Sequence, residues 1–354
     1  MHAAPMDLTD SRTLGRSGLV VSPLALGTMT FGGGRWGSSD DEAAAVFDAY
    51  VEAGGTFVDT ADVYAGGRSE ELVGRLVADR GLRDRVVLAT KYGFNPEPGN
   101  PNAGGNGRKN LRRALEGSLR RLGTDYVDLY WVHIWDAVTP VEELVESLAQ
   151  VVREGKARYV GLSNAPAWVA ARAATLAQAH GLPGPIALQM EYSLVARHVE
   201  NEHVPAAQAL GLGLVPWSPL AGGFLAGTYE RDSDPDSGRL SGPNPFGDSK
   251  FSDRNWDTLD ALRAVAAELD RSPAQVALAW ALGRPGVSSV LVGARTERQL
   301  RDNLGALDVA LTDGHRQRLD AASVRRGDLP MRELASPEIR RMLFGGHTVR
   351  GSSG

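Results

Sequence analysis

Four residues that could carry proton-transfer chemistry follow or end short apolar runs of this sequence. Asp59 lies at the end of TFVDT, Lys91 ends VVLATK, His133 ends VDLYWVH, and Tyr64 follows Asp59 in DTADVY. A lysine inside an apolar run is unusual, because burying an unpaired ammonium costs several kcal/mol. A buried Lys91 therefore needs a carboxylate beside it, and Asp59 is the candidate.

Together, these side chains could reduce a carbonyl group. The developing alkoxide needs a proton donor, and a free phenol with a pKa of roughly 10 is a poor acid at neutral pH. An ammonium beside Tyr64 lowers that pKa because it stabilises the phenolate. His133 can orient the carbonyl oxygen as a hydrogen-bond donor. None of the four residues carries hydride, so this chemistry requires a cofactor.

Eight apolar runs alternate with amphipathic helical stretches and must position these residues. Continuous apolar runs are typical of strands that are covered on both faces. The alternation allows a closed (β/α)8 barrel or an open doubly wound sheet. Eight strands, with no GxGxxG motif after the first, favour the α/β barrel, in which chemistry lies at the carboxyl ends of the strands. The runs begin at Leu24, Thr56, Val86, Val127, Ala157, Ile186, Leu212 and Ser288.

Local signals mark the ends of several elements. Thr139-Pro140 followed by Glu142 predicts a capping box with proline at the first helical position, and Gly155 lies near the end of that helix. Ser272-Pro273 opens another helix. The segment RTLGRSGLVV, before the first strand, predicts an N-terminal β-hairpin that closes the bottom of the barrel.

Length and composition restrict the class of protein. The chain has 354 residues, which fits one barrel domain at about residues 12–322 followed by a loop or tail at 323–354. A net charge of −5 argues against a nucleic-acid or anionic-membrane partner. The absence of cysteine excludes thiolate chemistry, and without HExxH spacing we expect no metal site. No long apolar run or signal-like N-terminus is present, so we expect a cytoplasmic protein.

The sequence resembles the aldo-keto reductase superfamily over about residues 12–322. DTADVY from Asp59, ATKYG around Lys91 and the strand ending in His133 match the family's Asp, Tyr, Lys and His tetrad in order. QMEYSL and WSPLAGGFLAGTY look like the branch that includes bacterial sugar ketoreductases, aldehyde reductases and potassium-channel β subunits. The resemblance implies a (β/α)8 barrel with long loops that reduces a small carbonyl substrate, with Tyr64 as the acid.

The resemblance also implies NADPH as the cofactor. GLSN from Gly161 is similar to the family segment that holds the nicotinamide carboxamide. WSPLAGG is similar to the segment that surrounds the nicotinamide ring and the pyrophosphate. GARTERQLRDNL is similar to the segment that binds the adenosine phosphate. Arg295 would face the 2′-phosphate, Arg239 would add a phosphate contact, and Gly293 stands where some NADPH-dependent members have lysine. By position, the cofactor contacts are Thr28, Met29, Asp59, Ser163, Asn164, Gln189, Trp217, Ser218, Leu220, Gly222, Gly293, Arg295, Gln299, Asp302 and Asn303.

Three functions stay open at this point. The first is an active carbonyl reductase, and the second is a regulatory module of the channel-subunit kind that keeps the tetrad and the cofactor. The third is an aldolase or isomerase with Lys91 as a Schiff-base former, which the neighbouring carboxylate disfavours because it keeps the amine protonated. Aromatic side chains in the loops predict a partly apolar substrate pocket. The candidates for this pocket are Phe31, Trp36, Tyr92, Phe94 and Trp135.

Overall fold

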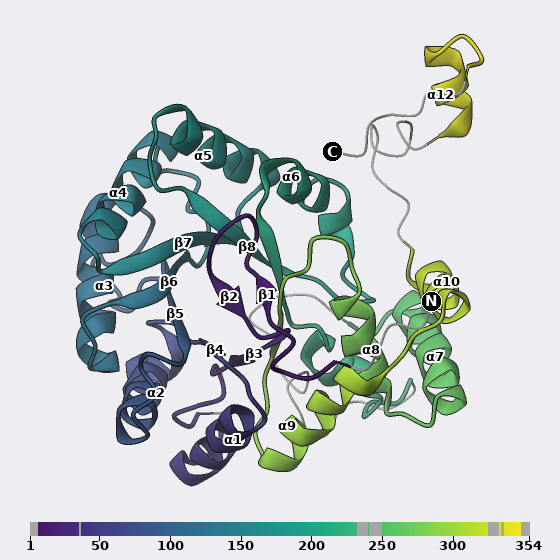
Figure 1. Cartoon of the computed structure of the whole chain (residues 1–354), viewed down its shortest axis with the longest axis horizontal. Coiled ribbons are helices and arrows are strands. Elements are labelled where there is room, and N and C mark those ends of the chain that lie inside the picture. Colours follow the sequence, from purple (N-terminus) through teal and green to yellow (C-terminus); the bar gives the residue numbers. More distant parts are fainter. Residues whose placement is uncertain are drawn as a thin grey trace.

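Eight parallel strands form a nearly closed barrel in the computed structural model, which describes residues 6–34, 37–231, 240, 250–324, 333 and 336–347 (Figure 1). The strands are hydrogen-bonded in the order β10-β3-β4-β5-β6-β7-β8-β9, and β10 also contacts β9. The predicted (β/α)8 barrel is therefore confirmed. The strands are β3 (Leu24–Gly27), β4 (Phe57–Asp59), β5 (Val87–Tyr92), β6 (Val127–Val132), β7 (Ala157–Ser163), β8 (Pro185–Glu191), β9 (Gly213–Trp217) and β10 (Val290–Val292).

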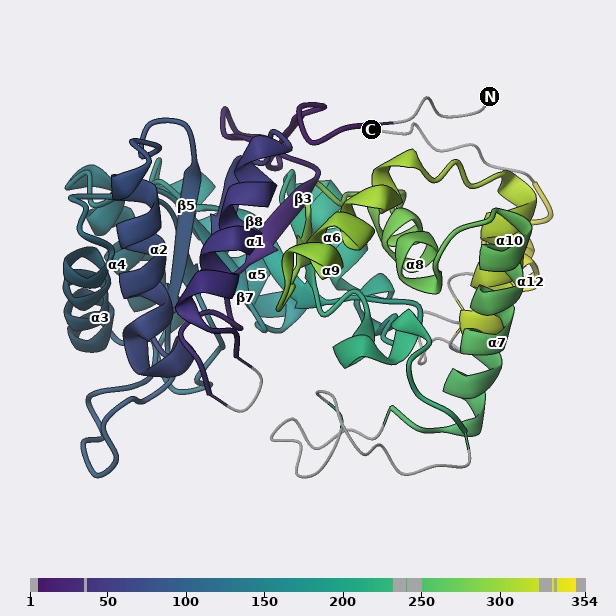
Figure 2. The same cartoon turned by 90° about the horizontal axis from the view of Figure 1, so that it is seen from below.

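A short hairpin closes the amino end of the barrel, as predicted. Strands β1 (Arg12–Thr13) and β2 (Val20–Val21) pair antiparallel, and Leu14 and Val21 pack into the barrel interior. Gly15 has a φ of +62°, and a Cβ on it would overlap the carbonyl oxygen of Ile186, so the turn requires glycine there. Figure 2 shows this hairpin at the opposite end of the barrel from the loop after β5.

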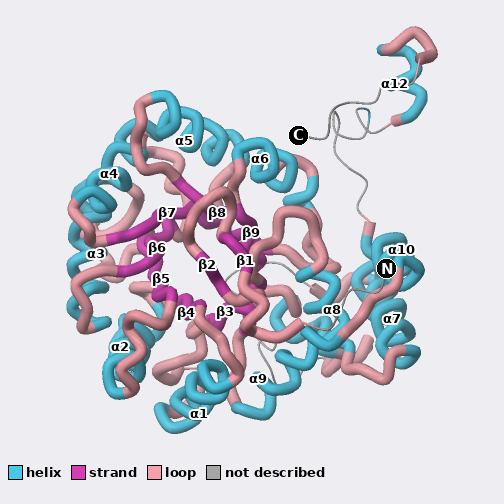
Figure 3. The backbone as a smooth tube through the Cα atoms, viewed as in Figure 1, coloured by secondary structure: helices cyan, strands magenta, loops and turns pink. Residues whose placement is uncertain are grey.

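Helices surround the strands (Figure 3). Helix α7 and helix α10 pack against each other outside α8 and are additions to the simple strand–helix repeat. The helices are α1 (Asp40–Glu52), α2 (Arg68–Asp79), α3 (Arg108–Leu122), α4 (Val141–Arg153), α5 (Ala167–Ala179), α6 (His203–Leu210), α7 (Asp253–Glu268), α8 (Pro273–Leu282), α9 (Glu297–Leu304), α10 (Asp313–Ser323) and α12 (Pro337–Leu343), with 3₁₀ turns η1 (Tyr64–Gly67), η2 (His198–Glu200), η3 (Ala221–Ala226) and η4 (Gly305–Asp308). Within the described residues, no helix is long and apolar enough to cross a membrane.

Alternation along each strand separates two hydrophobic layers. On β5, Val87 and Ala89 pack inside the barrel, whereas Leu88 and Tyr92 pack in the layer between the strands and the helices. Lys91 lies two residues after Ala89 and therefore points to the inner side of the barrel mouth. The pleat of the strand thus decides which of its last two residues faces the mouth.

One of the two predicted helix starts is confirmed and the other is wrong. Ser272 Oγ accepts a hydrogen bond from the Gln275 backbone, and Gln275 returns one to the Ser272 backbone, so α8 begins with a capping box. Helix α4 instead begins after Pro140, which makes no side-chain cap. Thr139 Oγ1 donates to Asp136 Oδ2 at 2.7 Å. The hydroxyl that was expected to cap the helix is therefore bonded to Asp136. Gly155 follows the end of α4 with a φ of +74°, as its position predicted.

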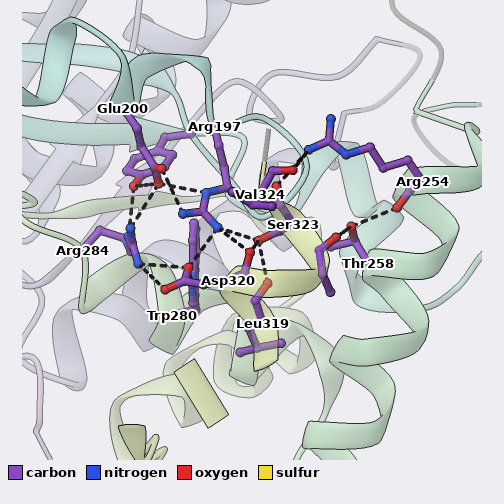
Figure 4. A network of polar contacts seen from close by, with 12 residues as sticks. Arg197, Glu200, Arg254, Thr258, Trp280, Arg284, Leu319, Asp320, Ser323 and Val324 are labelled. Atoms are coloured by element: carbon purple, nitrogen blue, oxygen red, sulfur yellow. Dashed lines mark hydrogen bonds and ion pairs between the residues drawn. The ribbon is translucent and has the colours of Figure 1, made fainter. Parts of the chain in front are cut away.

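Side chains from two other elements hold the end of α10 (Figure 4). Arg197, beside η2, donates to Asp320 Oδ1 at 2.9 Å and to Ser323 Oγ at 2.7 Å. From α7, Arg254 donates to the carbonyl oxygen of Ser323 at 3.2 Å, and Thr258 donates to that of residue 322 at 2.9 Å. The contacts from Arg254 and Thr258 satisfy carbonyl groups that the helix end leaves open. The domain boundary after residue 322 remains a prediction.

Gly161 is predicted to be required by the packing of the barrel interior. It lies on β7 opposite Trp131 of β6, and a Cβ on Gly161 would overlap the buried Trp131 ring. Gly161→Ala should lower the free energy of unfolding by about 1–3 kcal/mol, as overpacking does. Denaturant unfolding measures the loss. Gly18→Ala is the control, because its Cβ meets only Tyr159 Oη at 3.6 Å; equal stability of both variants would contradict the packing.

Candidate active site

The strand ends bring the four candidate catalytic residues together. Asp59 ends β4, Lys91 lies near the end of β5, His133 follows β6, and Tyr64 begins η1. Lys91 Nζ forms an ion pair with Asp59 Oδ2 and donates to Tyr64 Oη at 3.3 Å. The rings of Tyr64 and His133 meet edge to face, with their centroids 5.8 Å apart. The phenol therefore has an ammonium and an imidazole as direct neighbours.

The ion pair between Lys91 and Asp59 is completely buried. The side chains are 0% and 1% exposed, respectively, so water does not screen the pair. Protein groups complete the hydrogen bonding, since Lys91 Nζ also donates to the Thr60 carbonyl at 2.9 Å and Gln189 Nε2 donates to Asp59 Oδ1 at 3.1 Å. Burial lowers the pKa of Lys91, but Asp59 and Tyr64 outweigh it and the pKa lies above its usual value. Lys91 is therefore an ammonium at neutral pH, which disfavours a Schiff-base role.

His133 is a neutral imidazole in this site. Burial lowers its pKa well below the usual value, and the charge on Lys91 lowers it further. Its Nδ1 atom is buried and has no hydrogen-bond partner in the described part of the chain. A neutral imidazole has one N–H donor, so His133 can offer a single proton-bearing nitrogen to a ligand.

The residues expected around the nicotinamide lie beside the tetrad. Asn164 has a φ of +47°, and its side chain donates to the His133 carbonyl at 2.9 Å and accepts from Trp217 Nε1 at 3.1 Å. Ser163 pairs in register with Gln189, and both side chains are buried. Gln189 connects this group to Asp59. The structure thus brings Ser163, Asn164, Gln189 and Trp217 together at the mouth of the barrel.

The segment after β9 is a tight turn with several left-handed residues. Left-handed conformations occur at Ser218, Ala221 and Gly222, with φ values of +53°, +50° and +69°, whereas Leu220 between them has a φ of −98°. The N–H groups of Ala221 and Gly223 donate to the carbonyl oxygens of Ser218 and Leu220 within this turn, and the assignment of Ser218, Leu220 and Gly222 to a pyrophosphate remains a prediction. Directly after β3, the Thr28 backbone and hydroxyl both donate to the Asp59 carbonyl, which fixes Thr28 and Met29 beside the tetrad.

The segment after β10 presents an exposed arginine before a helix. Arg295 is exposed, and its backbone N–H donates to Gln299 Oε1 at 2.9 Å. Gly293 at the strand end is also exposed, and its carbonyl accepts from Asn303 Nδ2 at 3.4 Å. This geometry keeps Arg295 available to a ligand. Assignment of these residues to a cofactor remains a prediction.

One cofactor assignment in this segment needs correction. Asp302 accepts hydrogen bonds from Gln275 Nε2 at 3.1 Å and from Ser272 Oγ at 3.3 Å. Its carboxylate therefore faces the start of α8 and stabilises that helix end, instead of facing an adenine.

Two substrate-pocket candidates also need correction. Tyr92 is fully buried and stacks on Tyr130 with ring centroids 5.0 Å apart, because its place on β5 turns it toward the helices. Phe31 is fully buried in the same outer layer. Neither ring is open to a substrate.

Two other pocket candidates lie near the mouth. Phe94 is 39% exposed and meets the His133 ring edge to face at 4.8 Å between centroids. Trp135 is partly buried and lies 6.4 Å from the Trp168 ring. Their contact with a substrate remains a prediction, and Trp36 and Arg239 lie outside the described residues.

Comparison with known proteins identifies the family. The model of the aldo/keto reductase family matches residues 23–324. The chain belongs to this family. It is 41% identical over 303 residues to a rice (Oryza sativa subsp. japonica) protein named as a probable voltage-gated potassium channel subunit beta, covering 84% of this chain and 91% of the rice protein.

Other relatives carry the names of oxidoreductases. The chain is 38% identical over 308 residues to the uncharacterized oxidoreductase YrpG of Bacillus subtilis, with 84% of this chain and 91% of the relative covered. It is also 38% identical over 307 residues to the norsolorinic acid reductase stcV of Emericella nidulans, with 84% and 77% covered. The family and these relatives support an oxidoreductase.

Sequence reasoning missed a second buried acid in the DTADVY segment. Asp62 is 8% exposed, and its Oδ1 atom has no hydrogen-bond partner among the described residues. Burial, with the neighbouring Glu70 carboxylate, raises the pKa of Asp62 to about 7. The segment was interpreted only through Asp59 and Tyr64, and an acid in a turn between a strand and a helix gives no sequence signal of burial.

Asp62 is predicted to make stability depend on pH. Its folded pKa of about 7 lies above the unfolded value of about 3.9. Between these values the native state keeps a proton that the unfolded chain has lost, so stability falls as the pH rises toward 7 and then levels. Asp62→Asn removes this loss. Its stability relative to wild type should rise by about 1.4 kcal/mol per pH unit from about pH 5 to 7.

Unfolding in denaturant at several pH values measures this difference. Asp125→Asn, at an exposed aspartate, is the control and should stay within about 0.5 kcal/mol of wild type throughout. A difference between Asp62→Asn and wild type that is the same at pH 5 and pH 8 would show that Asp62 does not hold a proton in the native state.

Proposed function

We propose that this protein reduces an aldehyde or a ketone to the alcohol with NADPH, and that Tyr64 is the general acid. The observation that carries the proposal is the position of the Lys91 ammonium, 3.3 Å from Tyr64 Oη and paired with the buried Asp59. A phenol is a useful acid at neutral pH only when its anion is stabilised. A buried ammonium provides that stabilisation, because little solvent screens its charge.

Each residue of the tetrad has a distinct part in the proposed reaction. Tyr64 Oη gives its proton to the oxygen of the carbonyl as negative charge develops there. Lys91 stabilises the phenolate that remains, and Asp59 keeps Lys91 charged. His133, held neutral, can donate one hydrogen bond that orients the carbonyl oxygen without adding a positive charge.

The residues at the mouth fit a nicotinamide cofactor. The hydroxyl and amide side chains of Ser163, Asn164 and Gln189 can meet a carboxamide group, and the half-buried Trp217 ring can pack on a flat heterocycle. The turn around Ser218 would hold the pyrophosphate. When bound, NADPH supplies the hydride that the protein side chains cannot provide.

A regulatory role of the channel-subunit kind is the second candidate. The 41% identity to the rice protein named as a channel β subunit favours it, and the tetrad fits both functions. Turnover separates them. NADPH oxidation followed by absorbance over a panel of aldehydes and ketones should show catalysis, whereas cofactor binding with no turnover of any carbonyl would favour the regulatory role.

Tyr64→Phe is predicted to abolish most of the activity. The variant keeps the ring and removes the acidic proton, so reduction should slow by about 10²-fold or more, while cofactor affinity stays almost unchanged. Steady-state kinetics and a cofactor titration measure the two effects. Tyr126→Phe, immediately before β6 and at the opposite end of that strand from His133, is the matched control. Near wild-type turnover of Tyr64→Phe would remove Tyr64 from the mechanism.

Arg295→Ala is predicted to reduce the preference for NADPH. A guanidinium can meet the 2′-phosphate with two parallel hydrogen bonds, and NADH lacks that phosphate. NADPH binding should weaken by roughly 1.5–3 kcal/mol, while NADH binding stays nearly constant. Arg298→Ala, at an exposed arginine on helix α9, which follows Arg295, is the control. Equal losses of NADPH and NADH affinity in Arg295→Ala, or a wild-type preference for NADH, would show that Arg295 does not bind the 2′-phosphate.

A further inference from the structure

A cavity of about 150 Å³ lies between η1, helix α3 and the loop after β5. Asp62 and Gly66 come from the segment after β4, and Arg113, Gly117, Arg120 and Arg121 come from α3. Neither Lys91 nor any proposed nicotinamide contact lines it. The volume is smaller than the 300–1,000 Å³ or so of a typical site for a drug-sized ligand, so the cavity suits a small ion or one group of a larger molecule.

Two polar atoms of the cavity residues are buried and unsatisfied. Asp62 Oδ1 and Arg113 Nε have no hydrogen-bond partner in the described part of the protein. The Asp62 side chain belongs to a residue that is only 8% exposed. Buried polar groups are normally hydrogen-bonded, so these two atoms indicate an absent partner at this position.

Three arginines surround the cavity against the carboxylates of Glu70 and Glu97, so the surroundings carry a net positive charge while Asp62 holds its proton. Arg121 is partly compensated by Glu70, which its Nε contacts at 2.6 Å, and Arg113 by Glu97 at 2.8 Å. Arg120 makes no side-chain hydrogen bond or ion pair with any described residue. Arginine side chains present several N–H donors in a plane and match the oxygens of phosphate-like ions. The charge balance therefore favours an anion over a cation.

Glycines make room for the arginine that closes the cavity. A Cβ on Gly67 would lie 2.7 Å from Arg121 Cδ, and one on Gly117 would lie 3.1 Å from Arg121 Nη1. Gly66 has a φ of +64°, and a Cβ there would meet no atom within 4 Å. The turn thus passes the cavity without a side chain that would fill it.

We propose that this cavity binds a small oxyanion of the phosphate or sulfate type, held by Arg113, Arg120 and Arg121 with Asp62 as a proton-bearing partner. An ionised Asp62 would repel the anion, whereas a protonated Asp62 can donate a hydrogen bond to it. Anion binding is therefore coupled to protonation of Asp62. The charged and titratable groups that face Asp62 are Glu70 on α2, Arg113 and Arg121 on α3, Tyr92 on β5 and Tyr130 on β6.

Titration calorimetry with inorganic sulfate tests the proposal on the full chain. Sulfate keeps the same charge between pH 6 and 8, so a pH dependence of its binding belongs to the protein. With chloride used to match the ionic strength, sulfate should bind more tightly at pH 6 than at pH 8. Asp62→Asn should remove most of that difference. Failure of wild-type protein to bind sulfate at pH 6, or equal affinity at both pH values, would overturn the proposal.

Three arginine variants locate the anion. Arg120→Gln should weaken sulfate binding about threefold to tenfold, the range for one partly exposed charge-assisted contact. Arg153→Gln is the matched control, because it is also an exposed arginine in the last turn of its helix, α4. Arg295→Gln would weaken binding only if the anion occupied the proposed cofactor-phosphate position. Weaker sulfate binding in Arg295→Gln but not in Arg120→Gln would show that the anion does not bind in the cavity. An equal loss of sulfate affinity in Arg120→Gln and Arg153→Gln would show the same.

A comparison of two anions identifies the form of the ligand. Equal affinity for inorganic phosphate and for glycerol 3-phosphate at pH 6, each lost in Arg120→Gln, would support a site for the free ion. Tighter binding of glycerol 3-phosphate would support a site for the phosphoryl group of a metabolite. The proposal is independent of the proposed reductase activity, because neither titration measures turnover.

Discussion

The buried ion pair between Lys91 and Asp59 is the interaction on which the site depends. Taking both charges out of water is costly, and the cost is offset only where good geometry and further hydrogen bonds surround the pair. The barrel meets this requirement from three strands. Asp59 comes from β4, Lys91 from β5, and Gln189 reaches Asp59 from β8 on the far side of the mouth. The remaining donor capacity of Lys91 goes to the Thr60 carbonyl and to Tyr64 Oη, so the charge of the pair is directed at the phenol.

The same barrel mouth also sets the charge and orientation of the neighbouring groups. Burial beside Lys91 keeps His133 neutral, which leaves Lys91 as the cation next to Tyr64. Asn164 adopts a left-handed conformation that is uncommon for residues other than glycine, although asparagine tolerates it better than most. Hydrogen bonds to the His133 carbonyl and from Trp217 hold it there. Three strand ends are therefore linked through one amide side chain, and the proposed nicotinamide contacts share a rigid frame with the tetrad.

Much of this arrangement could be predicted from sequence because its signals are local and repeated. Eight apolar runs predicted the positions of the eight barrel strands, and a polar residue at the end of such a run indicates the barrel mouth. Prediction was wrong where a single competing contact decided the outcome. The Thr139 hydroxyl donates to Asp136 and does not cap α4. The Asp302 carboxylate accepts a hydrogen bond from Gln275 of α8. The pleat of β5 places Tyr92 in the layer between the strands and the helices. Asp62 was missed because the groups beside it include Arg113 and Arg121 of α3, about fifty residues later in the chain, and no local pattern indicates that neighbourhood.

A double-mutant cycle on Lys91 and Asp59 tests the central claim, that the site is organised by a buried ion pair, most directly. Lys91→Met, Asp59→Asn and the double variant are unfolded in denaturant at neutral pH, with wild type as the reference. Each single variant leaves a buried group without its partner and should lose about 3–5 kcal/mol of stability. The double variant should lose clearly less than the sum of the two, by at least about 1 kcal/mol. Losses that add within about 0.5 kcal/mol would contradict a direct pair and with it the account of Tyr64 as an activated acid.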